Sequence, residues 1–189
     1  AAFFHPEERV QVKALEALAR LAAKPSIAAR ILSTTSTIKE ALRAFESKTT
    51  GSTRAILAME LVHAMVTNRE FAQMGVAFDA ESSVVLARAL ASVLKTTPVA
   101  NSTPDDIRFL VAGIDVIWHI VRYSNYDDRI QTSLAEEGVL RYLLTLRPIA
   151  SKSTELARVL CGLAMALALE NTTVQAMMTE PSVKFPRLV

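Results

Sequence analysis

A polar break recurs four times along the chain, each time between a long apolar segment and a shorter one. The four breaks read KPS, TNRE, SNYDD and ENTT. The first apolar residues after them are Ile27, Phe71, Ile130 and Val174, which are separated by 44, 59 and 44 positions. A period of about 40–47 residues, with two or three helices in each unit, is typical of stacked helical repeats. The sequence therefore predicts an array of similar helical units.

Apolar residues recur at helical spacing in the segments between the breaks. In one long segment, Leu110, Ile114, Ile117 and Val121 fall on a single face. Ala and Leu dominate the composition and glycine is scarce, at 5 residues, which favours helices over a sandwich or barrel. Helices are predicted over residues 9–23, 27–32, 38–45, 53–66 and 71–74, from a cap at Ser82 and Ser83 to residue 95, and over 105–121, 139–146, 154–169 and 174–178, with a short one ending at Ala135.

Stacking is required because a unit of two or three helices cannot bury its apolar side alone. We expect one domain over residues 1–189, with units at roughly 9–52, 53–104, 105–153 and 154–189. The segment 154–169 is apolar nearly all round, so several of its sides should be buried. We therefore expect the chain to be a piece of a longer array, or to have its ends covered by a partner.

The order of elements within a unit narrows the repeat class. The order is a long helix, a polar turn with Asn, a short helix ending in Gly, and a further apolar helix. NYDDRIQTSLAEEGVLRYLLTL has this order, TNREFAQMG followed by VVLARALASVL has it in part, and LAAKPSIAARIL lacks the glycine. The pattern resembles the armadillo repeat, with a HEAT-like or irregular solenoid as the alternative. The resemblance implies an all-α fold, a right-handed α–α superhelix of armadillo-like three-helix repeats.

The resemblance also implies a binding groove lined by the long helices. In the family's peptide-import members, a Trp and an Asn one turn apart near the end of each long helix clamp an extended peptide. The positions that match this pair are Leu15 and Ala19, Met59 and His63, and Asp115 and His119. None of them is a Trp–Asn pair, and Trp118 is displaced by one position, so recognition of basic import signals is not expected. The candidate groove residues are Met59, His63, Asp115, His119 and Arg122.

Two interpretations of the histidines stay open. In the first, His63 and His119 form a polar row in the groove. Asp115 and His119, spaced i, i+4 with the acid first, can then pair, and positive charge on His119 near neutral pH would favour acidic peptides. In the second, both histidines are half-buried spacers between stacked helices.

No catalytic or metal-binding set stands out in the sequence. The three histidines form no HExxH motif, and the five scattered glycines form no phosphate-binding loop. The single cysteine, Cys161, lies in the most apolar segment, which predicts a buried, inert thiol. Acid pairs such as Asp105–Asp106 and Asp127–Asp128 are expected to favour helix starts through the helix dipole. We expect no enzymatic activity, no cofactor and no metal.

Charge and hydropathy limit the partners. The net charge of +2 is too small to indicate nucleic acid or an anionic membrane. The longest uncharged apolar stretch, 159–169, is shorter than the roughly 20 residues that span a bilayer, and the first residues, AAFFHPEER, lack a signal-peptide layout. One cysteine suits a reducing compartment. We expect a cytoplasmic protein, with cytoskeletal association as a variant.

These features together predict a non-enzymatic protein–protein interaction scaffold. It would bind a protein or peptide partner through the groove or the exposed ends of the solenoid, without nucleic acid and without membrane insertion. The alternative is a structural subunit of a large cytoskeletal, ciliary or other multiprotein assembly, in which the apolar last helix is an interface. An α-helical enzyme is a third reading, and it would require a deep polar pocket with convergent acids.

Overall fold

The computed structural model describes residues 7–22, 24, 27, 53–67, 80–97 and 99–180. Every regular element in these ranges is a helix, which confirms the predicted all-α class. The helices are α1 (Glu8–Ala22), α4 (Thr53–Val66), α6 (Ala80–Lys95), α7 (Pro104–Tyr123), α8 (Asp128–Glu136), α9 (Val139–Thr145), α10 (Arg147–Ala150), α11 (Thr154–Ala168) and α12 (Thr172–Thr179). The helices predicted at 27–32, 38–45 and 71–74 lie outside the described residues, apart from Ile27.

Periodicity located most helices to within a few residues, but one local prediction was wrong. Ser82 and Ser83 do not cap α6, because the helix begins at Ala80 and includes both of them. The helix predicted over 139–146 ends at Thr145, and a separate four-residue helix, α10, follows it with Pro148 in its first turn. Proline is tolerated there because a first-turn N–H has no partner within the helix.

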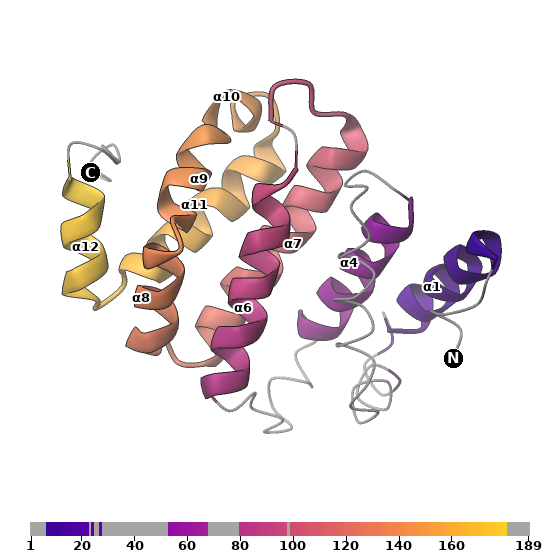
Figure 1. Ribbon diagram of the computed structural model, residues 1–189, viewed down its shortest axis with the longest axis horizontal. Helices are drawn as coiled ribbons and strands as arrows, with labels where there is room; N and C mark the ends of the chain where they lie inside the picture. The colour runs from indigo at the N-terminus through magenta and orange to yellow at the C-terminus, as the bar shows by residue number, and fades with distance from the viewer. Residues whose placement is uncertain are drawn as a thin grey trace.

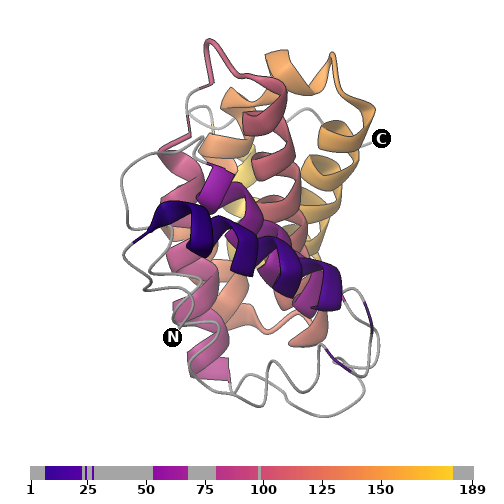
Figure 2. The ribbon, with the colours of Figure 1, turned by 90° about the vertical axis from the view of Figure 1, so that its right-hand side faces the viewer.

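The long helices pack side by side in the order of the chain. α4 packs against α1, α7 against α4, and α11 against α7. Figure 1 shows this row running from α1 at one end of the molecule to α11 and α12 at the other. The end-on view in Figure 2 places α6 to one side of the row, where it packs on α7 and α8. Each long helix therefore covers a flank of the next one.

α7 contributes more buried residues to the core than any other described helix. The predicted core face is confirmed, since Leu110, Ile114, Ile117 and Val121 are all at most 1% exposed. Burial also extends to residues outside that face, such as Val116, because neighbouring helices cover α7 on more than one side. Burying one large aliphatic side chain contributes about 1.5–3 kcal/mol. The buried aliphatic residues of α7 therefore contribute a large part of the free energy that stabilises the fold.

Polar residues between the helices start α7 and α8. Thr103 and Asp106 form a capping box, in which the Thr103 N–H donates to Asp106 Oδ2 at 2.8 Å and the Asp106 N–H donates to Thr103 Oγ1 at 3.2 Å. Asp127 caps α8 by accepting from the Arg129 N–H at 2.9 Å. Both acid pairs therefore lie at helix starts, as predicted.

The last polar break connects two consecutive units through buried amides. Asn171 is 4% exposed, and its Nδ2 donates to Gln131 Oε1 at 3.1 Å. Gln131 Nε2 in turn donates to the carbonyl oxygens of Ala166 and Leu169 at 2.8 and 2.9 Å. Carbonyls at a helix end lack partners within the helix, so Gln131 of α8 satisfies the end of α11.

Two glycines allow close approach between packed helices. A Cβ at Gly162 of α11 would lie 2.7 Å from Cη2 of Trp118 and 2.8 Å from two other atoms of the indole. A Cβ at Gly113 of α7 would lie 2.6 Å from a terminal methyl of Leu94. The α7–α11 contact thus depends on a small residue facing a rigid ring.

We predict that Gly162→Ala lowers the free energy of unfolding by about 1 kcal/mol. Overpacking against the indole costs about 1–3 kcal/mol, and the better helix propensity of Ala offsets about 1 kcal/mol of that cost. In a Trp118→Ala background the same substitution should stabilise the protein, because the ring is gone. Urea unfolding measures both effects.

Gly113→Ala is the matched control. It faces a flexible Leu94 methyl that can rotate away, so its effect should be smaller. An equal loss from Gly162→Ala with and without the indole would contradict the packing account.

Candidate functional site

Polar side chains of α4, α7 and α11 lie along the row of packed helices. We name this group the polar face: Glu60 and His63 of α4, Arg108, Asp115, His119 and Arg122 of α7, and Arg158 of α11. On α7 these positions lie seven, four and three residues apart, which places them along one side of the helix. The polar face therefore follows α7 and reaches onto its two neighbours.

Asp115 lies at the centre of the polar face and links all three helices. Its side chain is only 8% exposed. His63 of α4 donates from Nε2 to Asp115 Oδ2 at 2.8 Å, and Arg158 of α11 places Nη2 3.7 Å from Asp115 Oδ1. The Asp115 carboxylate of α7 thus accepts a hydrogen bond from His63 on α4 and lies near the guanidinium of Arg158 on α11.

His119 completes the cluster one turn along α7. Its Nδ1 lies 2.8 Å from the carbonyl oxygen of Asp115 and 3.7 Å from Asp115 Oδ2. Because a carbonyl can only accept, Nδ1 carries the proton. The ring also meets the edge of Tyr123, with centroids 5.5 Å apart. These contacts fix the imidazole while Nε2 has no hydrogen-bond partner among the described residues.

The surroundings of Asp115 favour its ionised form. Burial opposes ionisation, but the hydrogen bond from His63 and the charges of His119, His63 and Arg158 outweigh it, so the pKa of Asp115 is lowered. Its Oδ1 is buried without a hydrogen bond in this structure. The cluster therefore holds a negative charge in a place from which water is largely excluded.

Arg158 also contacts the one tryptophan of the chain. Its Cζ lies 5.7 Å from the centroid of the Trp118 ring, within the range of a cation–π contact. The same ring packs on Gly162. The guanidinium thus connects the carboxylate of Asp115 with the aromatic surface beside it.

The predicted groove residues are not all brought together. His63, Asp115 and His119 meet, and Arg122 is exposed on the same helix. The placement of Met59 in the groove was wrong: this residue is 0% exposed. Its methyl group lies 3.1 Å from where a Cβ of residue 113 would be, so it belongs to the α4–α7 core. The position one turn before His63 on α4 is therefore buried.

Sequence reasoning missed the part played by Arg158. The signal was present, because Arg158 is the only cationic residue in the otherwise apolar segment of α11. A single charge on such a helix indicates the side that reaches solvent. Its partner on α7 could not be identified without the packing of the two helices.

The predicted burial of Cys161 was also wrong. The thiol is exposed, and so is the neighbouring Met165, at 59%. The flank of α11 that packs on α7 buries its apolar residues, but no described element covers the side that carries these two sulfur atoms. An apolar helix is fully buried only where neighbours surround it.

Within the described residues, no group of three His, Cys, Asp or Glu side chains is placed to hold a metal ion. No helix in that part of the chain is both long enough and apolar enough to cross a bilayer.

Comparison of the chain with family models, with curated proteins and with solved structures finds no match.

We predict that Asp115→Asn lowers the free energy of unfolding by about 1–3 kcal/mol near neutral pH, the range for hydrogen bonds to charged groups. The folded-state pKa of Asp115 is lowered, so its contribution is present above the unfolded value of about 4 and is lost as pH falls through the folded value. The gap between parent and variant should therefore shrink at about pH 3 and below.

Urea unfolding near neutral pH and at about pH 3 measures the difference in free energy of unfolding between parent and variant. Glu60→Gln is the matched control, because Glu60 also pairs across α4 and α7, with the exposed Arg108. A surface pair of that kind contributes at most about 1 kcal/mol. A gap for Asp115→Asn that stays constant with pH would contradict the ionised state of the carboxylate.

Proposed function

We propose that the chain is a non-enzymatic protein-interaction scaffold built from armadillo-like helical repeats. In this proposal a partner protein or peptide binds across the polar face, and α4, α7 and α11 serve as the long helices of consecutive repeats. The resemblance of the polar turns and the glycine hinge to the armadillo pattern supports this assignment. Gly138 at the hinge has φ of +80°, a left-handed conformation that favours glycine.

One observation carries the proposal. The cluster of His63, Asp115 and His119 occupies consecutive long helices and is held in place by hydrogen bonds and packing, although it lies at the surface of the row. Ordered polar groups that remain partly accessible are pre-organised to bind, because less side-chain entropy is lost when a partner arrives. In the proposal, the Nε2 of His119, which has no hydrogen-bond partner among the described residues, is the atom of this cluster that a partner reaches.

The charge of the polar face favours an acidic partner. Arg122 and Arg158 are exposed, Arg108 is paired with Glu60 and Asp105, and the carboxylate of Asp115 is buried beneath its partners. Arg122 has no ion-pair partner among the described residues and is exposed. Trp118 supplies apolar surface beside these charges.

A second candidate function is a structural subunit of a larger assembly. The exposure of Met165 and Leu169, at 59% and 44%, favours it. Large apolar side chains grouped at the end of a helical row are typical of a surface that another protein covers. This candidate uses the end of the row rather than the polar face, and the two surfaces are separable by mutation.

We predict that His63→Ala combined with His119→Ala weakens binding of an acidic peptide about tenfold, because losing a charge-assisted contact costs about 1.5 kcal/mol or more. The probe is a fluorescein-labelled peptide of alternating Glu and Ser, with the Lys–Ser peptide as its counterpart. Fluorescence anisotropy measures the affinity of each peptide. Circular dichroism should show unchanged helicity.

Arg129→Ala is the matched control, since Arg129 is an exposed cation that already pairs with Asp127 at the start of α8 and is not part of the polar face. It should leave the affinity unchanged. If the double histidine variant binds as tightly as the parent, or if the Lys–Ser peptide binds better than the Glu–Ser peptide, the proposal is wrong.

A further inference from the structure

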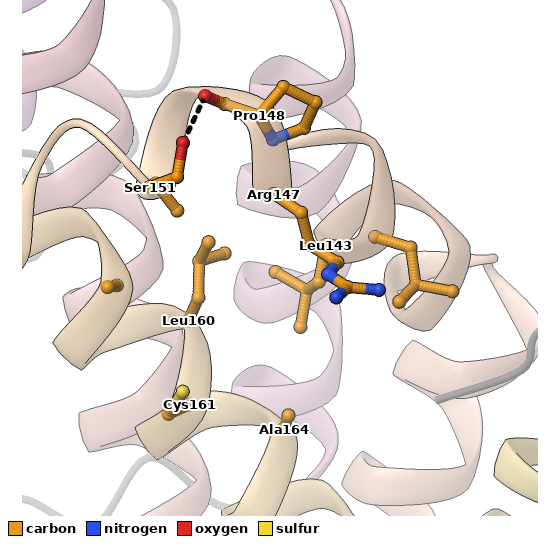
Figure 3. Close-up of a pocket in the computed structure, with 10 residues that line it drawn as sticks. Leu143, Arg147, Pro148, Ser151, Leu160, Cys161 and Ala164 are labelled. Atoms are coloured by element: carbon orange, nitrogen blue, oxygen red, sulfur yellow. Dashed lines mark hydrogen bonds between the residues drawn. The ribbon is translucent and has the colours of Figure 1, made fainter. Parts of the chain in front are cut away.

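A groove of about 690 Å³ lies between α9, α10 and α11, apart from the polar face. Its walls include Leu143 of α9, Arg147 and Pro148 of α10, and Leu160 and Ala164 of α11. Figure 3 shows the α11 residues facing Leu143 and Arg147 across the opening. Most of the surface is aliphatic, and its one charged side chain is that of Arg147.

The α11 side of the groove has the shape that close helix packing needs. Ala157, Cys161 and Ala164 are small and recur at three- and four-residue spacing, which places them along one side of the helix. Small residues in such a row allow another backbone to approach closely. Met165 lies next to this row and extends the apolar surface into solvent, at 59% exposure.

The packing of α11 on α7 shows how one helix of this fold covers the side of another. α11 covers a flank of α7, where Gly162 receives the Trp118 ring and Arg158 approaches Asp115. Leu160 and Ala164 stand two residues from Gly162, about 200° round the helix, so the groove lies on the side of α11 that faces away from α7. A further helix seated there would cover α11 much as α11 covers α7.

The positive charge of Arg147 indicates that a helix bound in the groove carries an acidic residue. Arg147 is exposed at the edge of the groove and has no ion-pair partner among the described residues. In the α7–α11 contact the guanidinium of Arg158 faces a carboxylate on the opposing helix. A carboxylate on the incoming helix would satisfy Arg147 in the same way.

We propose that the α9–α11 groove binds an amphipathic α-helix of a partner protein, with an apolar face that contains small residues and an acidic residue that pairs with Arg147. The apolar walls supply most of the affinity, and the ion pair sets the identity and position of the bound segment. This surface is separate from the polar face, and the inference does not depend on peptide binding there.

Cys161 provides a direct readout, because it is the only cysteine of the chain and lies in the groove. The probes are two synthetic peptides of about 18 residues, long enough to form helix. Both have Leu and Ala on one face, and they differ only in carrying Glu or Lys at both ends of that face. The rate of Cys161 alkylation by iodoacetamide is measured as each peptide is added.

We expect the Glu peptide to slow alkylation at least tenfold at saturation. The Lys peptide should need at least a fivefold higher concentration for the same protection. Arg147→Glu should reverse this preference, and Ala157→Trp should fill the groove and abolish protection by either peptide. In the double variant His63→Ala, His119→Ala, the peptides should protect Cys161 as well as they do in the parent. This result separates the groove from the polar face.

Three results would overturn the inference. The first is an alkylation rate that neither peptide changes. The second is equal protection by the two peptides that Arg147→Glu does not alter. The third is protection that grows with the concentration of the protein alone, since the groove would then bind a second copy of the chain.

Discussion

The structure depends on the lateral packing of long helices, each of which covers a flank of the next. α7 shows the requirement most clearly, because α4 lies against it on one side and α11 on another, and its large aliphatic residues are almost fully buried. Gly113 and Gly162 bring these helices close together. The burial of α7 therefore depends on both neighbours, because neither flank would be covered without them.

Both candidate binding surfaces are consequences of that packing. Where three long helices meet, their outward positions combine into the polar face, and Asp115 is held ionised between His63 of one neighbour and Arg158 of the other. Where the described row ends, α11 has a flank without a following long helix, and the α9–α11 groove and Met165 are exposed there. One surface is therefore polar and pre-organised, and the other is apolar and incomplete.

The sequence predicted the helices far better than it predicted their exposed sides. Periodicity and turn chemistry located α4, α7 and α11 because each depends on residues close in the chain, such as Thr103 and Asp106. The errors concern contacts between distant segments. The armadillo resemblance placed Met59 in a groove, and the apolar character of its segment placed Cys161 in the core. Burial is decided by which neighbour covers which side, and Met59 is covered by α7 while Cys161 is exposed. Arg158 was overlooked for the same reason.

The most direct test of the row is a nuclear Overhauser measurement on Trp118, whose signals are unambiguous because it is the only tryptophan. Protons less than about 5 Å apart give a cross-peak, and Gly162 lies against the six-membered ring of the indole. The account predicts strong cross-peaks between the Trp118 ring and the α-protons of Gly162. If these are missing while the ring shows cross-peaks to α1, the long helices are not arranged in chain order, and the account is wrong.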